Sequence, residues 1–401
     1  MYWTVHLHGG PRRVNHAAVV VGTNIITFGG DCSGADDDGP IDIYALDTVK
    51  LKWWKIEGDE NNENAPFQRS GFTTVVYDKK IYLWGGSNDS RVCNTLYCFD
   101  TETLKWSIPD VRGTKPAPRS GHSACMIGRR MYIYGGCHDG QFSQELSMFD
   151  FGRMRWHRIR TENDPPSFRD FHTASAVGDR MYIFGGRGGH IVENEIDHEI
   201  YCSDVHYYDT KLNIWVRPTV QDGYKPPGRR NHSTFVHNQF LYLYGGFEKN
   251  ENTHFEDIYR YNVVSSTWSK VSPVGTAPCA RRRHICLLVN DKVFVYGGLS
   301  PISDNHIISM RRSRFRFTSR NRLKHHDDLH VLDLNPSLKD MCLVKVCEYV
   351  DEGDIIAPDD LVIPATLQKD LAFFQPLEIF NLAITDTEDE DEEQYELFFP
   401  P

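Results

Sequence analysis

The chain has 401 residues, with 44 basic and 55 acidic side chains and a formal net charge of −11. The negative charge argues against a general nucleic-acid binder, and no apolar run approaches the length that spans a bilayer. A hydrophobic content of 40%, with 31 glycines, 22 phenylalanines, 19 tyrosines and 8 tryptophans, excludes a wholly disordered chain and predicts β-strands joined by many turns.

The N-terminal segment, Met1 to His6, has no charged region followed by an apolar one, so we expect no cleaved secretion signal. The ten cysteines form no C-x-x-C motif and no zinc-finger spacing. Several lie in apolar, strand-like runs, where free thiols act as small hydrophobic side chains. We therefore expect reduced cysteines in an intracellular protein.

A repeated pattern dominates the chain from its first residues onward. An aromatic residue followed by Gly-Gly recurs six times, at intervals of 50 to 60 residues. An Arg lies 16 residues before the first glycine of every doublet, and a His lies 13 residues before it in five of the six. The doublets are Gly29-Gly30, Gly85-Gly86, Gly135-Gly136, Gly185-Gly186, Gly245-Gly246 and Gly297-Gly298.

Each repeat predicts four antiparallel strands. The first strand follows Arg-x-x-His, and the second is an apolar run that ends on Gly-Gly, as expected for a strand buried on both faces. The third strand ends near an Asp or Asn, and a Trp six residues later opens the fourth strand in the first five repeats. This Trp is large enough to fill the widening gap between neighbouring units.

The combination of Gly-Gly, a preceding aromatic residue and a spaced Trp resembles the kelch repeat, whose fold is a β-propeller. Six copies over residues 1–335 therefore predict an all-β, six-bladed propeller. The sixth repeat lacks its Trp, but Trp3 and the Gly-Gly-Pro-Arg-Arg that follows it match the pattern from Trp106 to Arg119. We expect the N-terminal strand to complete blade six and close the ring.

One face of this propeller should carry the Arg-x-x-His segments together with the residues that follow Gly-Gly. The Arg present in every repeat is expected to be architectural, and its His a structural residue more than a metal ligand. Four basic residues break the repeat, and guanidinium groups clustered near the axis suit an anion held bidentately, most naturally a carboxylate. These residues are Arg187, Arg230, Arg282 and Arg283.

Neither catalysis nor a cofactor is expected from the sequence. It contains no nucleophile elbow, P-loop or His-Glu-x-x-His motif, so we predict no catalytic residues and a protein that is not an enzyme. The run His325-His326-Asp327-Asp328 offers metal-ligand types, but in a polar loop we interpret it as solvated, and no metal is predicted. A kelch-like copper oxidase is a distant alternative because no copper-ligand set is recognisable.

After the propeller, the pattern changes to a helix. Leu338, Cys342 and Val346 are spaced four residues apart and share one helical face. The segment resembles a BC box, the helix by which cullin-RING substrate receptors bind elongin C. Pro358 to Leu361 resembles the cullin box that selects cullin-2, although Ala357 replaces the expected Leu before Pro358. The alternative is a helix that packs on the underside of the propeller.

The predicted domains are a propeller (1–335), a docking segment (336–365) and a largely disordered acidic tail (366–401), of which residues 386–396 carry eight acids. This order resembles the kelch substrate receptors of cullin-2 ubiquitin ligases. The resemblance implies recognition of protein C-termini that end in glycine, with elongin B/C, cullin-2 and a RING subunit as partners. Elongin C would contact Leu338, Cys342 and Val346, and cullin-2 would contact Pro358 and Leu361.

The resemblance also implies roles on the propeller face. Arg187, Arg230 and Asn231 would grip the terminal carboxylate, and we add Arg282 and Arg283 to this set. Asp170 could recognise a basic residue before the terminal glycine. We expect a cytoplasmic protein, with the nucleus left open, and no membrane partner. The alternative function is a ligase-independent scaffold, for example on chromatin, which is the one indirect route to nucleic acid.

Overall fold

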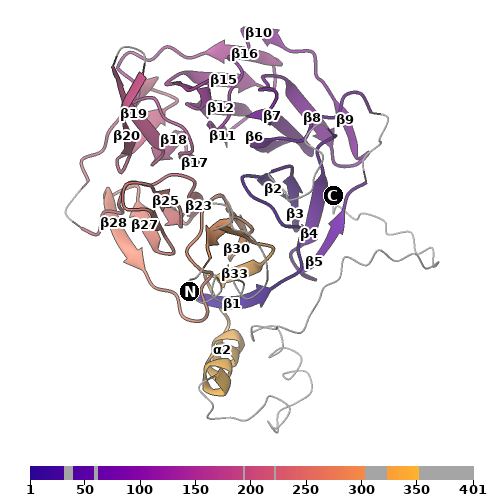
Figure 1. The fold of residues 1–401 in the computed structure, drawn as a ribbon, viewed down its shortest axis with the longest axis vertical. Coiled ribbons are helices and arrows are strands. Elements are labelled where there is room, and N and C mark those ends of the chain that lie inside the picture. Colours follow the sequence, from indigo (N-terminus) through magenta and orange to yellow (C-terminus); the bar gives the residue numbers. More distant parts are fainter. Residues whose placement is uncertain (31–38, 58–61, 193–194, 221–222, 303–322, 352–401) are drawn as a thin grey trace, which may run out of the picture.

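The computed structural model describes residues 1–30, 39–57, 62–192, 195–220, 223–302 and 323–351. Six sheets, each built on four antiparallel strands, stand around a central axis as the blades of a β-propeller (Figure 1). The first strands of neighbouring blades contact one another all the way round the ring. The predicted all-β, six-bladed propeller is confirmed.

The first three blades follow the chain from the inner to the outer strand. Blade one contains β2 (Ala17–Val21), β3 (Asn24–Phe28), β4 (Ile43–Asp47) and β5 (Lys52–Lys55). Blade two contains β6 (Ser70–Tyr77), β7 (Lys80–Ser87), β8 (Leu96–Asp100) and β9 (Lys105–Ser107). Blade three contains β11 (Ser123–Ile127), β12 (Arg130–Tyr134), β15 (Leu146–Asp150) and β16 (Arg155–Arg158), with the short β10 (Arg112–Gly113) parallel to β16.

Blades four and five repeat this order, and blade six differs in its outer strand. Blade four contains β17 (Thr173–Val177), β18 (Arg180–Phe184), β21 (Val205–Asp209) and β22 (Ile214–Val216). Blade five contains β23 (Ser233–His237), β24 (Phe240–Tyr244), β27 (Ile258–Asn262) and β28 (Thr267–Val271). Blade six contains β29 (Ile285–Val289), β30 (Lys292–Tyr296), β33 (Leu329–Asp333) and the N-terminal β1 (Tyr2–Leu7).

Short hairpins extend from one rim of the propeller, directly after Gly-Gly in blades three to six. They are β13 (Cys137–His138) with β14 (Gln141–Phe142), β19 (Arg187–Val192) with β20 (Glu195–Tyr201), β25 (Phe247–Glu248) with β26 (Thr253–His254), and β31 (Leu299–Pro301) with β32 (Leu323–His325). The segments that follow Gly-Gly in blades four and six therefore begin and end as paired strands. Residues 311–324 carry seven basic side chains, and most of this stretch lies outside the described residues.

The core consists of apolar layers between neighbouring blades, because each blade buries both of its faces. Met131 to Tyr134 of β12, for example, are all buried, as predicted for a second strand. In every layer, the Trp of one outer strand packs against the aromatic residue before Gly-Gly in the preceding blade. The predicted gap-filling role of the Trp is therefore confirmed.

The N-terminal strand closes the ring as the sequence predicts. β1 pairs with β33 in antiparallel register, with Trp3 opposite Leu332 and a bulge between Trp3 and Val5. The Trp3 ring lies 6.2 Å from that of Tyr244 in blade five, the same contact that a Trp makes in the other blades. Closure removes the two free sheet edges that an open arrangement would expose.

Helix α2 (Leu338–Asp351) follows β33 and lies outside the ring beside β1 (Figure 1). Ser337 caps it, since its hydroxyl accepts a hydrogen bond from the amide of Asp340, and the Asp340 carboxylate accepts one from the amide of Ser337. Because β33 runs away from the hairpin rim, α2 begins at the opposite rim. Among the described residues, no helix is long and apolar enough to cross a membrane.

Candidate functional site

The Arg of every repeat is buried inside its own blade. Each guanidinium donates a hydrogen bond to the carbonyl of the first glycine of its doublet, as Arg229 does to Gly245 at 3.0 Å. The backbone carbonyl of the same Arg accepts a hydrogen bond from the second glycine of the preceding blade. The predicted architectural role is confirmed, because each Arg links its own second strand and the neighbouring blade.

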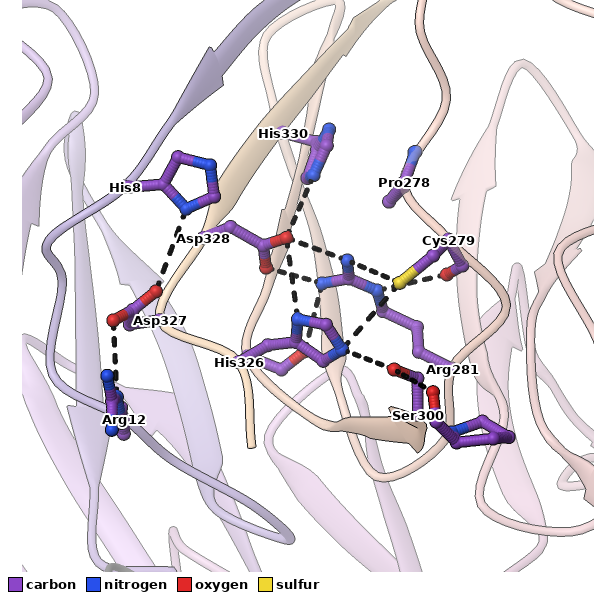
Figure 2. Close-up of polar contacts among 12 residues, drawn as sticks. His8, Arg12, Pro278, Cys279, Arg281, Ser300, His326, Asp327, Asp328 and His330 are labelled. Atoms are coloured by element: carbon purple, nitrogen blue, oxygen red, sulfur yellow. Dashed lines mark hydrogen bonds and ion pairs between the residues drawn. The ribbon is translucent and has the colours of Figure 1, made fainter. Parts of the chain in front are cut away.

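Acidic side chains neutralise several of these Arg residues. Asp328 accepts two hydrogen bonds from Arg281, at 2.6 and 2.8 Å (Figure 2). Asp42 and Asp257 pair in the same way with the Arg residues of blades one and five. Our interpretation of His325-His326-Asp327-Asp328 as a solvated loop is therefore wrong in part, since His326 and Asp328 are only 4% and 5% exposed. Asp328 is buried because it is the counter-ion of a buried guanidinium.

The repeat histidines are structural. His122, His172 and His232 are buried, and each ring hydrogen-bonds through Nε2 to a Thr or Ser hydroxyl of the preceding blade, at 2.7 to 3.0 Å. Each ring also packs edge-on against the aromatic residue before Gly-Gly. Burial lowers the pKa of His122 and His232 to about 3, so both rings are neutral at physiological pH.

A closed ring of backbone hydrogen bonds surrounds the axis at the position two residues after each repeat Arg. The amide of each residue donates to the carbonyl of its equivalent in the preceding blade, at 2.7 to 3.2 Å. All six residues have φ between 51° and 68°, and they border a narrow cavity of about 120 Å³. The ring consists of Asn15, Gly71, Gly121, Phe171, Asn231 and Arg283. The candidate residues Asn231 and Arg283 are thus held at the axis by their backbones.

The position directly after each repeat Arg faces the hairpin rim, which we call the binding face. In blades three to six this position forms a β-bridge with the residue directly after Gly-Gly: Ser120 with Cys137, Asp170 with Arg187, Arg230 with Phe247, and Arg282 with Leu299. The bridged pair in blade three contains no charged residue, whereas the pair in each of blades four, five and six contains at least one. The candidate residues predicted from the sequence therefore occupy one half of the binding face.

Arg187 is already neutralised by two acids of the protein. Its Nε and Nη2 atoms bind the Asp170 carboxylate at 3.1 and 2.6 Å, and its Nη1 atom lies 3.4 Å from Glu199. Asp170 is 1% exposed, and burial raises its pKa although Arg187 opposes the rise. The structure therefore places both oxygens of Asp170 against Arg187 and not against solvent.

Arg230 and Arg282 form a contrasting pair. Among the described residues neither forms an ion pair, and the Nε atom of each is buried without a hydrogen-bond partner. The Arg282 guanidinium lies 4.2 Å from the centre of the Phe247 ring, and that of Arg230 lies 5.9 Å from it. Burial, together with repulsion from Arg283 and Arg230, lowers the pKa of Arg282 to about 10. Among the described residues, both guanidinium groups therefore lack a directly bonded acid, and both stand beside an apolar ring.

Tyr201 and Phe247, which were not predicted from the sequence, lie between the Arg187 ion pairs and the Arg230–Arg282 pair. Tyr201 pairs with Arg187 across the β19–β20 hairpin, and its ring lies 5.8 Å from the Arg230 guanidinium. Its hydroxyl donates a hydrogen bond to Glu199 at 3.0 Å. Phe247 could have been found from the sequence, because it directly follows its Gly-Gly doublet, as Arg187 does. Arg187 also borders a groove of about 460 Å³ that extends towards the loops of blades two and three.

Two of the three predicted elongin-binding residues, Leu338 and Cys342, lie on the solvent side of α2. Leu338 is 74% exposed, Cys342 is exposed, and Val346 is half-buried. Leu343 and Val344, on the other side, are 5% and 4% exposed and anchor the helix. The predicted helix is confirmed and extends to Asp351. Pro358, Leu361 and the acidic tail lie outside the described residues.

Comparisons with known proteins give a consistent identification. Residues 71–298 match the family described as the KLHDC2/KLHL20/DRC7 Kelch-repeats domain. Kelch domain-containing protein 3 from Bos taurus and from Homo sapiens is 42% identical over 359 residues, which cover 86% of this chain and 91% of each relative. Kelch domain-containing protein 1 from Mus musculus is 33% identical over 111 residues, 26% of this chain and 27% of that protein. Together with the six-bladed propeller, these matches show that the chain belongs to the kelch-repeat family and is similar along most of its length to Kelch domain-containing protein 3.

Proposed function

We propose that this chain is the substrate-recognition subunit of a cullin-2 RING ubiquitin ligase. It binds protein C-termini that end in glycine on the binding face and docks to elongin B/C through α2. It catalyses nothing itself and brings the substrate close to the enzymes that transfer ubiquitin. We place it in the cytoplasm, with the nucleus as a second compartment.

The observation that carries the proposal is the uncompensated pair of Arg230 and Arg282. Two half-buried guanidinium groups repel each other, and an anion between them removes that repulsion and satisfies their donors. A peptide carboxylate supplies two acceptor oxygens, and the buried Phe247 ring supports the Arg282 guanidinium that stacks on it. Asn231 and Arg283 border the same region from the axis, whereas Arg187 contributes to the wall as a partner of Asp170.

Helix α2 supports the docking half of the proposal. A helix that only packed on the propeller would bury its apolar residues, yet Leu338 and Cys342 point away from the anchoring residues Leu343 and Val344. Exposed apolar side chains at this spacing suit insertion into the groove of a partner. Because α2 leaves the rim opposite the binding face, substrate and ligase would not compete for one surface.

Peptides that end in glycine as a free acid and as an amide test the binding half. The free acid should bind the wild-type chain about 10- to 100-fold more tightly, since charge-assisted hydrogen bonds contribute about 1.5–3 kcal/mol. Arg230→Gln and Arg282→Gln should each remove most of this difference in isothermal titration. Arg260→Gln is the matched control, because Arg260 lies within β27 and stacks on Phe240. Equal affinities for acid and amide would refute the carboxylate site.

A further inference from the structure

Blade two differs from the other blades at the position that can compensate its repeat Arg. An acidic residue directly precedes the third strand in five blades, whereas in blade two Thr95 stands there, directly before β8. The five acids are Asp42, Glu145, Asp204, Asp257 and Asp328. Arg69 is 1% exposed, its guanidinium carbon lies 3.6 Å from the centre of the Phe67 ring, and its Nη2 atom has no hydrogen-bond partner. Among the described residues, this buried guanidinium therefore has no carboxylate partner.

A thiol stands close to the position of the missing carboxylate. The amide of Cys93 donates to the carbonyl of the second glycine of its doublet at 3.0 Å, and Ser143 forms the same bond in blade three. The Ser143 hydroxyl accepts a hydrogen bond from the guanidinium of Arg119 at 2.7 Å. The equivalent backbone of blade two therefore directs the Cys93 sulfur towards the Arg69 guanidinium. The same sulfur accepts a hydrogen bond from the amide of Thr95 at 3.3 Å.

These neighbours favour the thiolate form of Cys93. Burial raises the pKa of this thiol, but the Arg69 guanidinium and the Thr95 amide outweigh burial, so the pKa lies below its usual value. Burial acts without such opposition on Cys125 of β11 and raises its pKa to about 12. Cys93 therefore differs from the strand cysteine, which acts as a small hydrophobic side chain.

The Cys93 thiol lies at the edge of the binding face. It is 9% exposed, and the residues directly before it, 88–92, border the groove of about 460 Å³ that also reaches Arg187. This exposure admits a reagent as small as hydrogen peroxide and excludes a bulky ligand. Arg230 and Arg282 belong to blades five and six, so the thiol is separate from the proposed carboxylate site.

We propose that Cys93 is the thiolate counter-ion of Arg69 and a modification site at which hydrogen peroxide oxidises the chain. The sulfur attacks one peroxide oxygen, so that an S–O bond forms while the O–O bond breaks. Sulfur loses two electrons and becomes a sulfenic acid, and the departing hydroxide takes a proton from solvent to form water. Low thiol pKa, a neighbouring cation and partial exposure are the properties of redox-sensitive cysteines.

Trapping of the sulfenic acid with dimedone in the full chain, followed by peptide mass spectrometry, tests the site. At pH 6.5, Cys93 should be oxidised by peroxide while Cys125 stays unlabelled. Thr95→Asp restores the acid of the other blades and should slow the oxidation of Cys93 by about 10-fold, since a nearby charge shifts a pKa by about one to three units. Thr219→Asp is the matched control, because it adds the same charge at an exposed position in blade four and should leave the rate unchanged.

The pH dependence of alkylation by iodoacetamide supplies a second readout. The rate at Cys93 should reach its plateau at a lower pH than the rate of free glutathione, and Thr95→Asp should move that plateau to higher pH. If Thr95→Asp failed to fold, the wild-type profile would still decide the question. No sulfenic acid at Cys93, a wild-type profile equal to that of glutathione, or an unchanged rate in Thr95→Asp would each overturn the proposal, whatever the outcome for peptide binding.

Discussion

Asp170 and Arg187 occupy positions that are Ser120 and Cys137 in blade three, so one blade has gained a buried ion pair where its neighbour has none. Removing one member of a buried pair leaves the other charge without compensation in a poorly solvated site. The loss in the free energy of unfolding when Arg187 is replaced therefore shows whether this residue stabilises the fold or is free to bind a ligand. Arg230 and Arg282 have no such acid among the described residues, which is the contrast on which the proposed carboxylate site rests.

Arg187→Gln should lower the free energy of unfolding by about 3 kcal/mol, because Asp170 would remain buried without its cation. Adding Asp170→Asn in the same chain should recover much of the loss, since the uncompensated charge is then gone. Chemical denaturation measures both values. Lys211→Gln is the control, because its pair with Asp179 is largely exposed and should contribute less than about 1 kcal/mol. A loss in Arg187→Gln no larger than in this control would contradict a structural role for the ion pair.

The buried repeat histidines make stability depend on pH. The pKa of His122 falls from 6.5 in the unfolded chain to about 3 in the fold, so the unfolded state binds the proton first as the pH drops below 6.5. Stability is therefore full above pH 6.5 and declines towards pH 3. Phe72 holds the equivalent position in blade two, which makes His122→Phe a substitution that the fold already tolerates.

Between pH 7 and pH 5.5, the wild-type chain should lose about 1 kcal/mol more stability than His122→Phe, because one buried imidazole no longer has to stay neutral. Denaturation midpoints at the two pH values measure the difference. Identical pH dependence in the two proteins would mean that His122 is protonated in the fold, contrary to its burial.

At the scale of elements, β1 forms the outer strand of blade six and α2 packs against β1. Trp3 takes the place of the outer-strand Trp that blade six lacks, and it packs between blades five and six with Tyr244 and Leu332. α2 lies against β1 through its buried side. Loss of the closing strand should therefore open the ring and loosen the helix, whereas changes on the exposed side of α2 should affect neither.

Trp3→Ala should cost about 3–5 kcal/mol, the range for emptying a large aromatic site in a packed core. Thermal or chemical unfolding measures the loss, and Tyr224→Ala, at a residue that is 72% exposed, should stay within about 0.5 kcal/mol of wild type. If Trp3→Ala were as mild as the control, β1 would not be the strand that completes blade six.

Leu338→Ala combined with Cys342→Ala should abolish co-purification with elongin C while leaving the unfolding midpoint unchanged, since both side chains are exposed. Lys345→Ala on the same helix is the control and should retain elongin C. Retention of elongin C by the double variant would favour the alternative of a ligase-independent scaffold.

The repeat pattern predicts the strands because its marker residues recur at nearly constant spacings along the chain. Gly-Gly, the aromatic residue before it and the Trp determine which strands are buried on both faces, and Trp3 could be assigned by the same rule. The partners of charged side chains are less predictable. Asp328 follows its doublet by a much longer interval than Asp42 does, and Glu199 reaches Arg187 only through the register of the β19–β20 hairpin.

At the scale of the whole molecule, the propeller separates two surfaces. The binding face carries Arg230 and Arg282, and the opposite rim leads into α2 with Leu338 and Cys342 exposed. The closed ring of axial backbone hydrogen bonds and the inter-blade aromatic layers hold the two surfaces in a fixed relation. A substrate receptor needs that arrangement, because its contribution is to keep a bound protein terminus within reach of the ligase.

A bridging experiment tests this claim most directly. An immobilised peptide that ends in glycine with a free carboxylate should capture elongin B/C only when the chain is present. Capture should be lost with Arg230→Gln plus Arg282→Gln and with Leu338→Ala plus Cys342→Ala, and retained with Arg260→Gln and Lys345→Ala. Capture that persists with the amidated peptide or with either double variant, or no capture by the wild-type chain, would contradict the proposed function.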